Sequence, residues 1–201
     1  MSYVYACATQ AESQANQDAH AVLQKDDRLI IIVADGAGGI GGGAAASAQF
    51  VRDVEARVDS IDTAAGWVRA LSQIDCAICQ GETTGIVLDI TEKKIVGSSV
   101  GDSQARIYDF DQEHDLTEVQ VRKPLLGTGD ARPCSIEGAF TSGILIAGTD
   151  GFWNYAKRDV IMAEAPHLPF PTSAKKLLDM ARLPSGALWD DTTVIVVKRA
   201  R

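Results

Sequence analysis

The 201-residue chain is short of several kinds of group, and each shortage excludes a class of protein. Its apolar runs are far shorter than the roughly 20 residues that a helix needs to cross a bilayer, so no membrane partner is expected. Lysine and arginine number 19 against 27 aspartate and glutamate residues, which gives a formal net charge of −8. No basic cluster occurs, which argues against nucleic acid as a partner. The start of the chain has no basic segment followed by an apolar core, and we expect a cytoplasmic protein.

Cysteine is also scarce, with four residues scattered along the chain, which argues against a disulfide framework. Cys76 and Cys79 have the spacing of a redox or half-zinc motif. Because no second cysteine or histidine pair stands at ligand spacing, we interpret this pair as buried structural thiols.

The hydrophobic content of 46% is enough for a full core, and we expect residues 1–201 to form a single domain. Apolar and β-branched runs predict strands at 3–9, 19–23, 84–90, 94–100, 105–108, 135–140, 143–147 and 193–198, and one more beginning at Leu29. Helical spacing predicts helices at 44–58, 61–78, 157–163 and 173–182. This order favours an α+β fold, a sandwich of two mostly antiparallel sheets flanked by helices.

Two hairpins are expected within this sandwich. The polar turn at 24–27 should join the strand at 19–23 to the strand that begins at Leu29, and residues 141–142 should join the strands at 135–140 and 143–147. The first hairpin would bring Asp18 and Asp35 side by side, because these residues stand at adjacent ends of an antiparallel pair.

Asp35 directly follows an apolar run, Ile30 to Val33, and a glycine-rich turn comes after it. A carboxylate at the end of a buried strand needs a partner, and a cation is one candidate. The alternative is that Asp35 caps the helix that begins near Ile40.

Five aspartates stand at strand ends or turns and could meet at one end of the sandwich. They are Asp18, Asp35, Asp102, Asp150 and Asp190. Their repulsion would be relieved by hard divalent cations such as Mg²⁺ or Mn²⁺, which prefer oxygen ligands. For any one of them alone, an ordinary turn aspartate is the simpler interpretation.

Five short motifs occur in a fixed order along nearly the whole chain. They are Asn16-Gln17-Asp18, Val33 to Gly39, Gly101-Asp102-Ser103, Gly148 to Trp153, and Asp190 to Val194. Together they resemble the metal-dependent serine/threonine phosphatases of the protein phosphatase 2C type. The resemblance implies the same four-layer sandwich and the hydrolysis of phosphoserine and phosphothreonine on proteins, with two Mn²⁺ or Mg²⁺ ions and a role in signal transduction.

The resemblance also assigns roles to individual residues. It makes Asp35 the carboxylate that bridges both metals and Gly36 a ligand through its carbonyl oxygen, and it places Asp150 and Asp190 on the first metal. Asp18 would orient the attacking water, and Asp102 would hold a third, weaker metal. The metals would activate water for in-line attack on the phosphoryl group.

Several residues depart from the pattern that the resemblance implies. Gln17 replaces a usual glutamate, so the second metal should bind more weakly. Ser13 and Gln104 stand where the family has arginines. Asp191 replaces a usual asparagine, and the short interval between Asp102 and Asp150 predicts a trimmed or absent flap.

These departures leave room for two alternatives. One is a pseudophosphatase that binds a phosphoprotein or a regulator without turnover. The other is dinucleotide binding, because residues 36–41 read GAGGIG, a glycine pattern of nucleotide-binding loops, between a strand and a helix. A dinucleotide fold would need a parallel strand after that helix, and the sequence there predicts a second helix instead.

Overall fold

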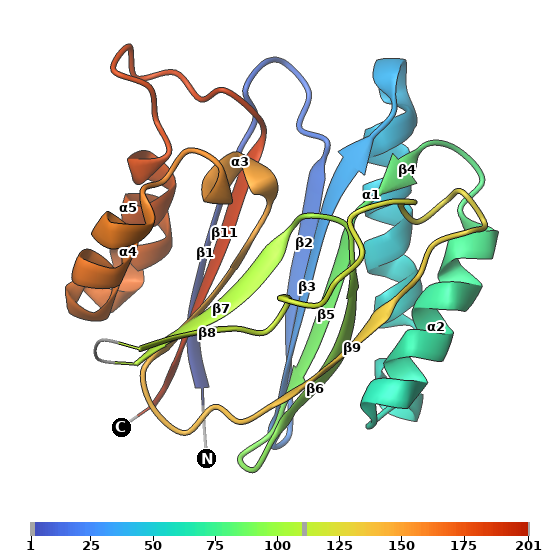
Figure 1. Ribbon diagram of the computed structural model, residues 1–201, viewed down its shortest axis with the longest axis horizontal. Helices are drawn as coiled ribbons and strands as arrows, with labels where there is room; N and C mark the ends of the chain where they lie inside the picture. Colours follow the sequence, from blue (N-terminus) through green and yellow to red (C-terminus); the bar gives the residue numbers. More distant parts are fainter. Residues whose placement is uncertain (1–2, 110–111, 201) are drawn as a thin grey trace.

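The computed structural model describes residues 3–109 and 112–200, and its elements form four layers (Figure 1). Two sheets pack face to face, with α1 and α2 on the outside of one sheet and α4 and α5 on the outside of the other (Figure 1). This is the α+β sandwich that the sequence predicts.

The first sheet has the order β2-β3-β5-β6-β9. Its strands are β2 (Asp18–Lys25), β3 (Arg28–Ala37), β5 (Gly85–Ile90), β6 (Ile95–Val100) and β9 (Cys134–Gly138), and the two-residue strand β4 (Glu82–Thr83) pairs with β3. The second sheet has the order β1-β11-β10-β7-β8. Its strands are β1 (Tyr3–Gln10), β11 (Thr192–Arg199), β10 (Ile144–Gly148), β7 (Gln104–Asp109) and β8 (Gln112–Asp115).

The helices lie close to their predicted positions. They are α1 (Gly39–Glu55), α2 (Ala64–Ala77), α4 (Arg158–Glu164) and α5 (Ser173–Met180), with the short α3 (Asp150–Trp153) in addition. Three short 3-10 turns occupy Val58–Ser60, Ala165–His167 and Phe170–Thr172. The side chain of Thr63 caps α2 by accepting a hydrogen bond from the Gly66 amide over 3.2 Å.

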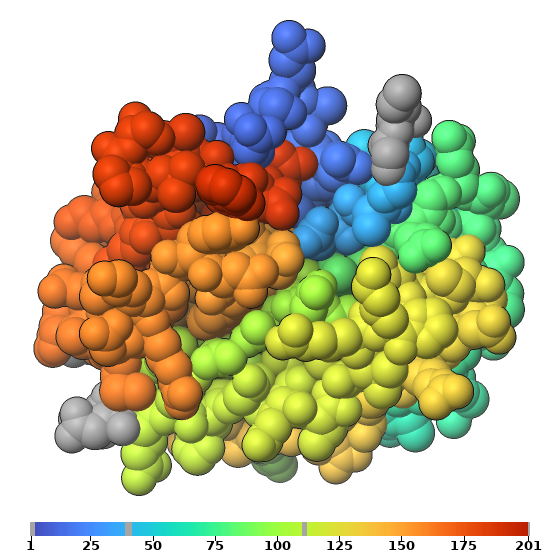
Figure 2. All heavy atoms as spheres, turned by 45° about the horizontal axis from the view of Figure 1, so that its top comes forward, coloured from blue at the N-terminus to red at the C-terminus, as the bar shows by residue number. Residues whose placement is uncertain are grey.

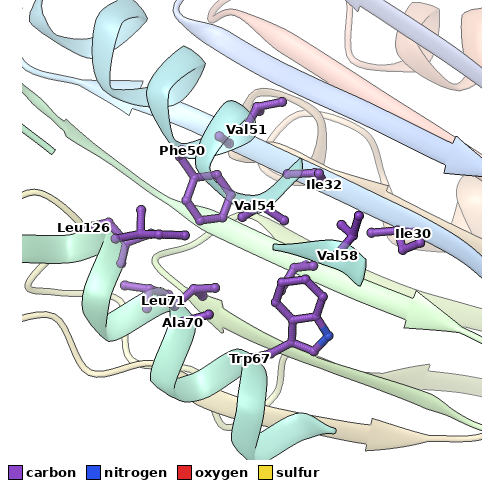
Figure 3. Close-up of a cluster of buried hydrophobic side chains, with 14 of the residues drawn as sticks. Ile30, Ile32, Phe50, Val51, Val54, Val58, Trp67, Ala70, Leu71 and Leu126 are labelled. Carbon is purple, nitrogen blue, oxygen red and sulfur yellow. The ribbon is translucent and has the colours of Figure 1, made fainter. Parts of the chain in front are cut away.

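Strand β3 is buried on both faces, which explains its continuous apolar run. Leu29, Ile31 and Val33 point into the layer between the sheets. Ile30 and Ile32 point the other way, into the cluster beneath α1 and α2 that Figure 3 draws with Phe50, Val54, Trp67 and Leu71. Because side chains alternate along a strand, β3 contributes to both core layers and is held firmly in place.

The predicted hairpin across residues 141–142 is wrong. Strand β9 pairs with β6 in the first sheet, whereas β10 lies between β11 and β7 in the second. The connection therefore crosses from one sheet to the other. Phe140 in this connection is buried in the layer between the sheets. A local pattern of two strands and a short link could not distinguish this crossing from a tight turn.

Two further expectations need correction. Cys76 and Cys79 are exposed rather than buried, because Cys76 lies on the outer side of α2 and Cys79 beyond the end of that helix; all four cysteines are free thiols. A dinucleotide-binding fold is also wrong, because every strand pair among the described residues is antiparallel and α1 is followed by a 3-10 turn and α2.

In the described part of the chain, none of the helices has the length and apolar character required to cross a bilayer.

Candidate active site

The five aspartates singled out in the sequence lie at the same end of the two sheets. Asp18 begins β2, Asp35 lies near the end of β3, and the two are register partners in the hairpin, as predicted. Asp102 lies in the turn between β6 and β7, Asp150 begins α3 after β10, and Asp190 precedes β11. The upper part of Figure 1 shows these strand ends together with α3.

Asp35 does not cap α1. The helix begins at Gly39 with Gly38 as its cap residue, and no side chain donates or accepts the capping hydrogen bond. The Asp35 backbone is instead held by Thr84, the residue that precedes β5. The Asp35 amide donates to the Thr84 hydroxyl over 2.9 Å, and the Asp35 carbonyl accepts from the Thr84 amide over 2.8 Å. The carboxylate is therefore free for the cluster.

The Asp35 carboxyl has a strongly raised pKa of about 9. Burial is the largest cause, followed by the negative charges of Asp18 and Asp150 and a side-chain hydrogen bond with Asp150. Two ionised carboxyl groups that lie next to one another repel strongly. One shared proton or one shared cation relieves this repulsion.

Asp18 is held from the opposite sheet. Its Oδ2 atom accepts a hydrogen bond from the Thr149 hydroxyl over 2.9 Å, although the two residues are 131 positions apart. Burial raises the pKa of Asp18 to about 7, while hydrogen bonds from Thr193 and Thr149 lower it and the charges of Asp191 and Asp190 raise it further. The carboxyl thus titrates near neutral pH.

Asp102 and Asp190 lie in the same electrostatic environment. Burial and then the charge of Asp150 raise the pKa of Asp102. Burial also raises the pKa of Asp190, with Asp150 and Asp191 acting in the same direction and the Asp191 amide acting against them. Asp150 therefore influences three of the other four carboxyl groups.

Buried hydroxyl groups support this cluster, and the sequence interpretation did not identify them as site residues. Thr84 and Ser103 share a hydrogen bond of 2.7 Å beneath Asp35 and Asp102. Thr149 accepts from the Thr193 amide over 3.0 Å while donating to Asp18. For Ser103 and Thr149 the available signal was their position within the aspartate motifs, whereas Thr84 lies outside all five motifs.

Asp191 has a structural role that was also missed. Its two carboxylate oxygens accept from the backbone amides of Glu12, over 2.8 Å, and Gln17, over 2.6 Å. The segment that precedes Asp18 is thereby tied to the start of β11. Asp191 positions Asp18 and was noted in the sequence only as a departure from asparagine.

Glycine is required where β3 meets α1. A methyl group on Gly36 would lie 2.2 Å from the Gly43 carbonyl oxygen, and one on Gly43 would lie 2.6 Å from the Gly36 carbonyl oxygen and 2.3 Å from the Gln17 side-chain oxygen. Only residues without a side chain allow this approach of the two backbones. It sets the first turns of α1 directly against the end of β3.

The oxygen-rich donor set suits a hard divalent cation. The Oδ1 atom of Asp18 and the Oε1 atom of Gln17 are buried without a hydrogen-bond partner, which is costly unless another group binds them. Over residues 3–109 and 112–200, however, no three acidic, histidine or cysteine side chains are arranged as a ligand set around one point. The carboxylate and carbonyl oxygens at this end of the sandwich are the donors that Mn²⁺ or Mg²⁺ prefers, so the residues fit such a cation by their chemistry.

Comparison with known proteins identifies the fold. No family model matches the sequence, and no curated protein matches it. Solved structures do match: the serine/threonine phosphatase of S. agalactiae has a TM-score of 0.82 at 18% identity, with 99% of this chain and 100% of that chain covered. A bacterial serine phosphatase gives 0.79 at 18% identity, covering 98% and 97%. The catalytic domain of the phosphatase PstP with two manganese ions gives 0.78 at 19% identity, covering 98% and 97%.

The chain therefore has the fold of bacterial serine/threonine phosphatases over its full length, and the resemblance to the protein phosphatase 2C type is confirmed for the fold. Asp18, Asp35, Asp102, Asp150 and Asp190 lie at one end of the sandwich, and the charges of Asp18, Asp150 and Asp190 all raise the pKa of Asp35.

Proposed function

We propose that the chain is a metal-dependent phosphatase that removes phosphate from phosphoserine and phosphothreonine on a protein substrate. The observation that carries this proposal is the position of Asp35 and Asp150 at the same end of the two sheets, where the charge of Asp150 is one of the causes that raise the pKa of Asp35. A phosphatase fold with this cluster at one end of the sandwich has the donor groups that Mn²⁺ or Mg²⁺ would require.

In this proposal Asp35, Asp150 and Asp190 would hold two cations with the Gly36 carbonyl, and Asp102 would supply a third, weaker site. The ions would supply positive charge that activates water and stabilises the phosphoryl group during in-line attack. Asp18 would orient the attacking water, because its Oδ2 is fixed by Thr149 while its Oδ1 has no other partner. Thr84 and Asp191 hold the backbones that carry these groups.

The test is hydrolysis of a phosphothreonine peptide and of p-nitrophenyl phosphate after chelator treatment, with Mn²⁺ added stepwise. Activity should follow the added Mn²⁺, and Asp35→Ala and Asp150→Ala should each reduce kcat by about 1000-fold, as removal of essential charge stabilisation does elsewhere. The matched control is Asp59→Ala, which removes an exposed carboxylate from the turn after α1. Full activity in both active-site variants would contradict the metal mechanism.

A pseudophosphatase is the second candidate, and one contact favours it. Gln104, at a position where related proteins are expected to have arginine, accepts a hydrogen bond from Arg106 over 3.1 Å through its Oε1 atom. It offers no positive charge to a phosphate. Binding of a phosphopeptide without turnover at any Mn²⁺ concentration would support this alternative. A cytoplasmic location and a role in signal transduction remain predictions from the sequence.

A further inference from the structure

A loop beside the candidate active site is attached to the turn that carries Asp102. The Gly101 amide donates to the Val121 carbonyl over 3.0 Å, and the Gln120 side chain donates to the Ser103 carbonyl over 2.7 Å. These two hydrogen bonds flank Asp102 in the sequence. The loop is therefore fixed against this turn.

The other side of the same loop is anchored to β4. Leu126 exchanges two backbone hydrogen bonds with Thr83, over 2.9 and 3.0 Å. Thr83 also donates through its hydroxyl to the Asp35 carbonyl over 3.0 Å. Residues 122–125 are thus held between two attachments. One is to Gly101 and Ser103, the residues on either side of Asp102, and the other is to Thr83, which contacts the Asp35 backbone.

This loop presents two exposed cations, Arg122 and Lys123. Arg122 directly follows Val121, whose carbonyl accepts from the amide of Gly101, the residue before Asp102. The backbone attachment therefore places the two cations beside the turn that carries Asp102, at the edge of the cluster.

Figure 2 turns this end of the molecule toward the reader and shows the yellow and yellow-green surface next to the orange region of the chain. A protein substrate whose phosphate reaches the aspartates would extend over the surface around them, and the loop that carries Arg122 and Lys123 is attached to that surface at Gly101 and Ser103.

We propose that Arg122 and Lys123 form a docking site for acidic side chains that flank the phosphorylated residue of the substrate. This inference rests on the proposed phosphatase function. The argument is one of charge: the surrounding surface carries the aspartate cluster, which repels an acidic substrate, and this pair supplies positive charge at its edge. Arg106 cannot serve in this way, because its guanidinium pairs with Glu113 and lies 4.9 Å from the ring centre of Trp153.

The experiment compares three substrates: a phosphothreonine peptide with aspartate and glutamate on both sides, the same peptide with alanine flanks, and p-nitrophenyl phosphate. The variant is Arg122→Gln/Lys123→Gln. The matched control, Lys93→Gln/Lys176→Gln, removes the same charge from the β5–β6 turn, at the opposite end of β5 from Thr84, and from α5.

We expect the loop variant to lose about tenfold in kcat/KM on the acidic peptide, the size expected for two surface charge pairs. The alanine-flanked peptide and p-nitrophenyl phosphate should change by less than about twofold, and about 0.5 M salt should remove the difference between the peptides. No loss on the acidic peptide would overturn the proposal. An equal loss on all three substrates would also overturn it, since the pair would then act on the phosphate itself.

Affinity separates this inference from the proposed function. Non-hydrolysable phosphonate forms of both peptides are titrated with Mn²⁺ present and followed by fluorescence anisotropy. The loop variant should weaken binding of the acidic phosphonate by about the same factor of ten. Absence of turnover with every substrate contradicts hydrolysis, while these affinities still decide whether the docking site exists.

Discussion

Buried carboxylates at the two ends of the sandwich have opposite kinds of electrostatic neighbour. At one end Asp89, with a side chain only 1% exposed, forms two hydrogen bonds with Arg28, whose guanidinium also donates to the Ile61 carbonyl over 2.7 Å. At the other end Asp35 has mainly other carboxyl groups as its electrostatic neighbours. The protein supplies a cation where a carboxylate serves the fold, and it gathers carboxylates where we propose that cations bind from solution.

Breaking the Arg28–Asp89 pair gives the largest expected change in stability. Arg28→Met would leave the Asp89 carboxylate buried without its cation, and we expect the free energy of unfolding to fall by about 3 kcal/mol. Urea unfolding measures this loss, and phosphatase activity at 25 °C should stay within about twofold because the pair is remote from the cluster. Replacing both partners, as Arg28→Met/Asp89→Leu, should recover part of the loss. Unchanged stability in the single variant would contradict the contrast between the two ends.

Removing a carboxyl group from the aspartate cluster should instead increase the free energy of unfolding. The pKa of Asp35 is raised to about 9, far above its ordinary value near 4, so between these values the folded protein keeps a proton that the unfolded chain has released. Without metal, stability should therefore fall as pH rises from about 4 to about 9. Asp35→Asn removes the part of this dependence that Asp35 contributes, and we expect it to be more stable than the natural protein by about 2 kcal/mol at pH 8.

Urea unfolding in chelator at several pH values tests this expectation. Asp59→Asn, at an exposed carboxylate, is the matched control and should leave the pH dependence unchanged. Added Mn²⁺ should stabilise the natural protein at pH 8 because a cation favours the ionised carboxylates. A natural protein and an Asp35→Asn variant with identical pH dependence would show that Asp35 is not perturbed in this way.

Adding a negative charge to the cluster should produce the smallest of these three effects. Gln17 lies beside it, with its amide donating to Asp191, its carbonyl accepting from Gly36, and its buried side-chain oxygen unpaired. Gln17→Glu should tighten Mn²⁺ binding by about tenfold in calorimetric titration, since a carboxylate adds negative charge near the ions. Gln73→Glu, an exposed substitution on α2, adds the same charge elsewhere and should have no effect. A weaker Mn²⁺ affinity in Gln17→Glu would count against a cation site at this position.

Local sequence signals were sufficient for one half of the site. The hairpin between β2 and β3 is set by an apolar run and a polar turn, so the pairing of Asp18 with Asp35 could be predicted. The approach of Asp150 and Asp190 depends on the second sheet. Their positions at strand ends allowed it, and the resemblance to known phosphatases assigned them to one site. No local pattern specifies which strands of two different sheets face one another.

The parts that could not be predicted are those that depend on contacts distant in sequence. Thr149 binds Asp18 across 131 residues, and Asp191 binds the amide of Gln17 across 174. Strand β8 is polar and lies at a sheet edge, so it has no alternating apolar pattern. Cys76 was misjudged because a helix has an outer side whose position is known only after packing.

The bond from Thr149 to Asp18 joins the beginning of the polypeptide to a region three quarters of the way along it, and Asp190 comes later still. A ribosome must therefore pass residue 190 before these groups can meet. Catalysis in the proposed scheme would begin only after that point, so a product that stops before Asp190 could not remove phosphate from other proteins.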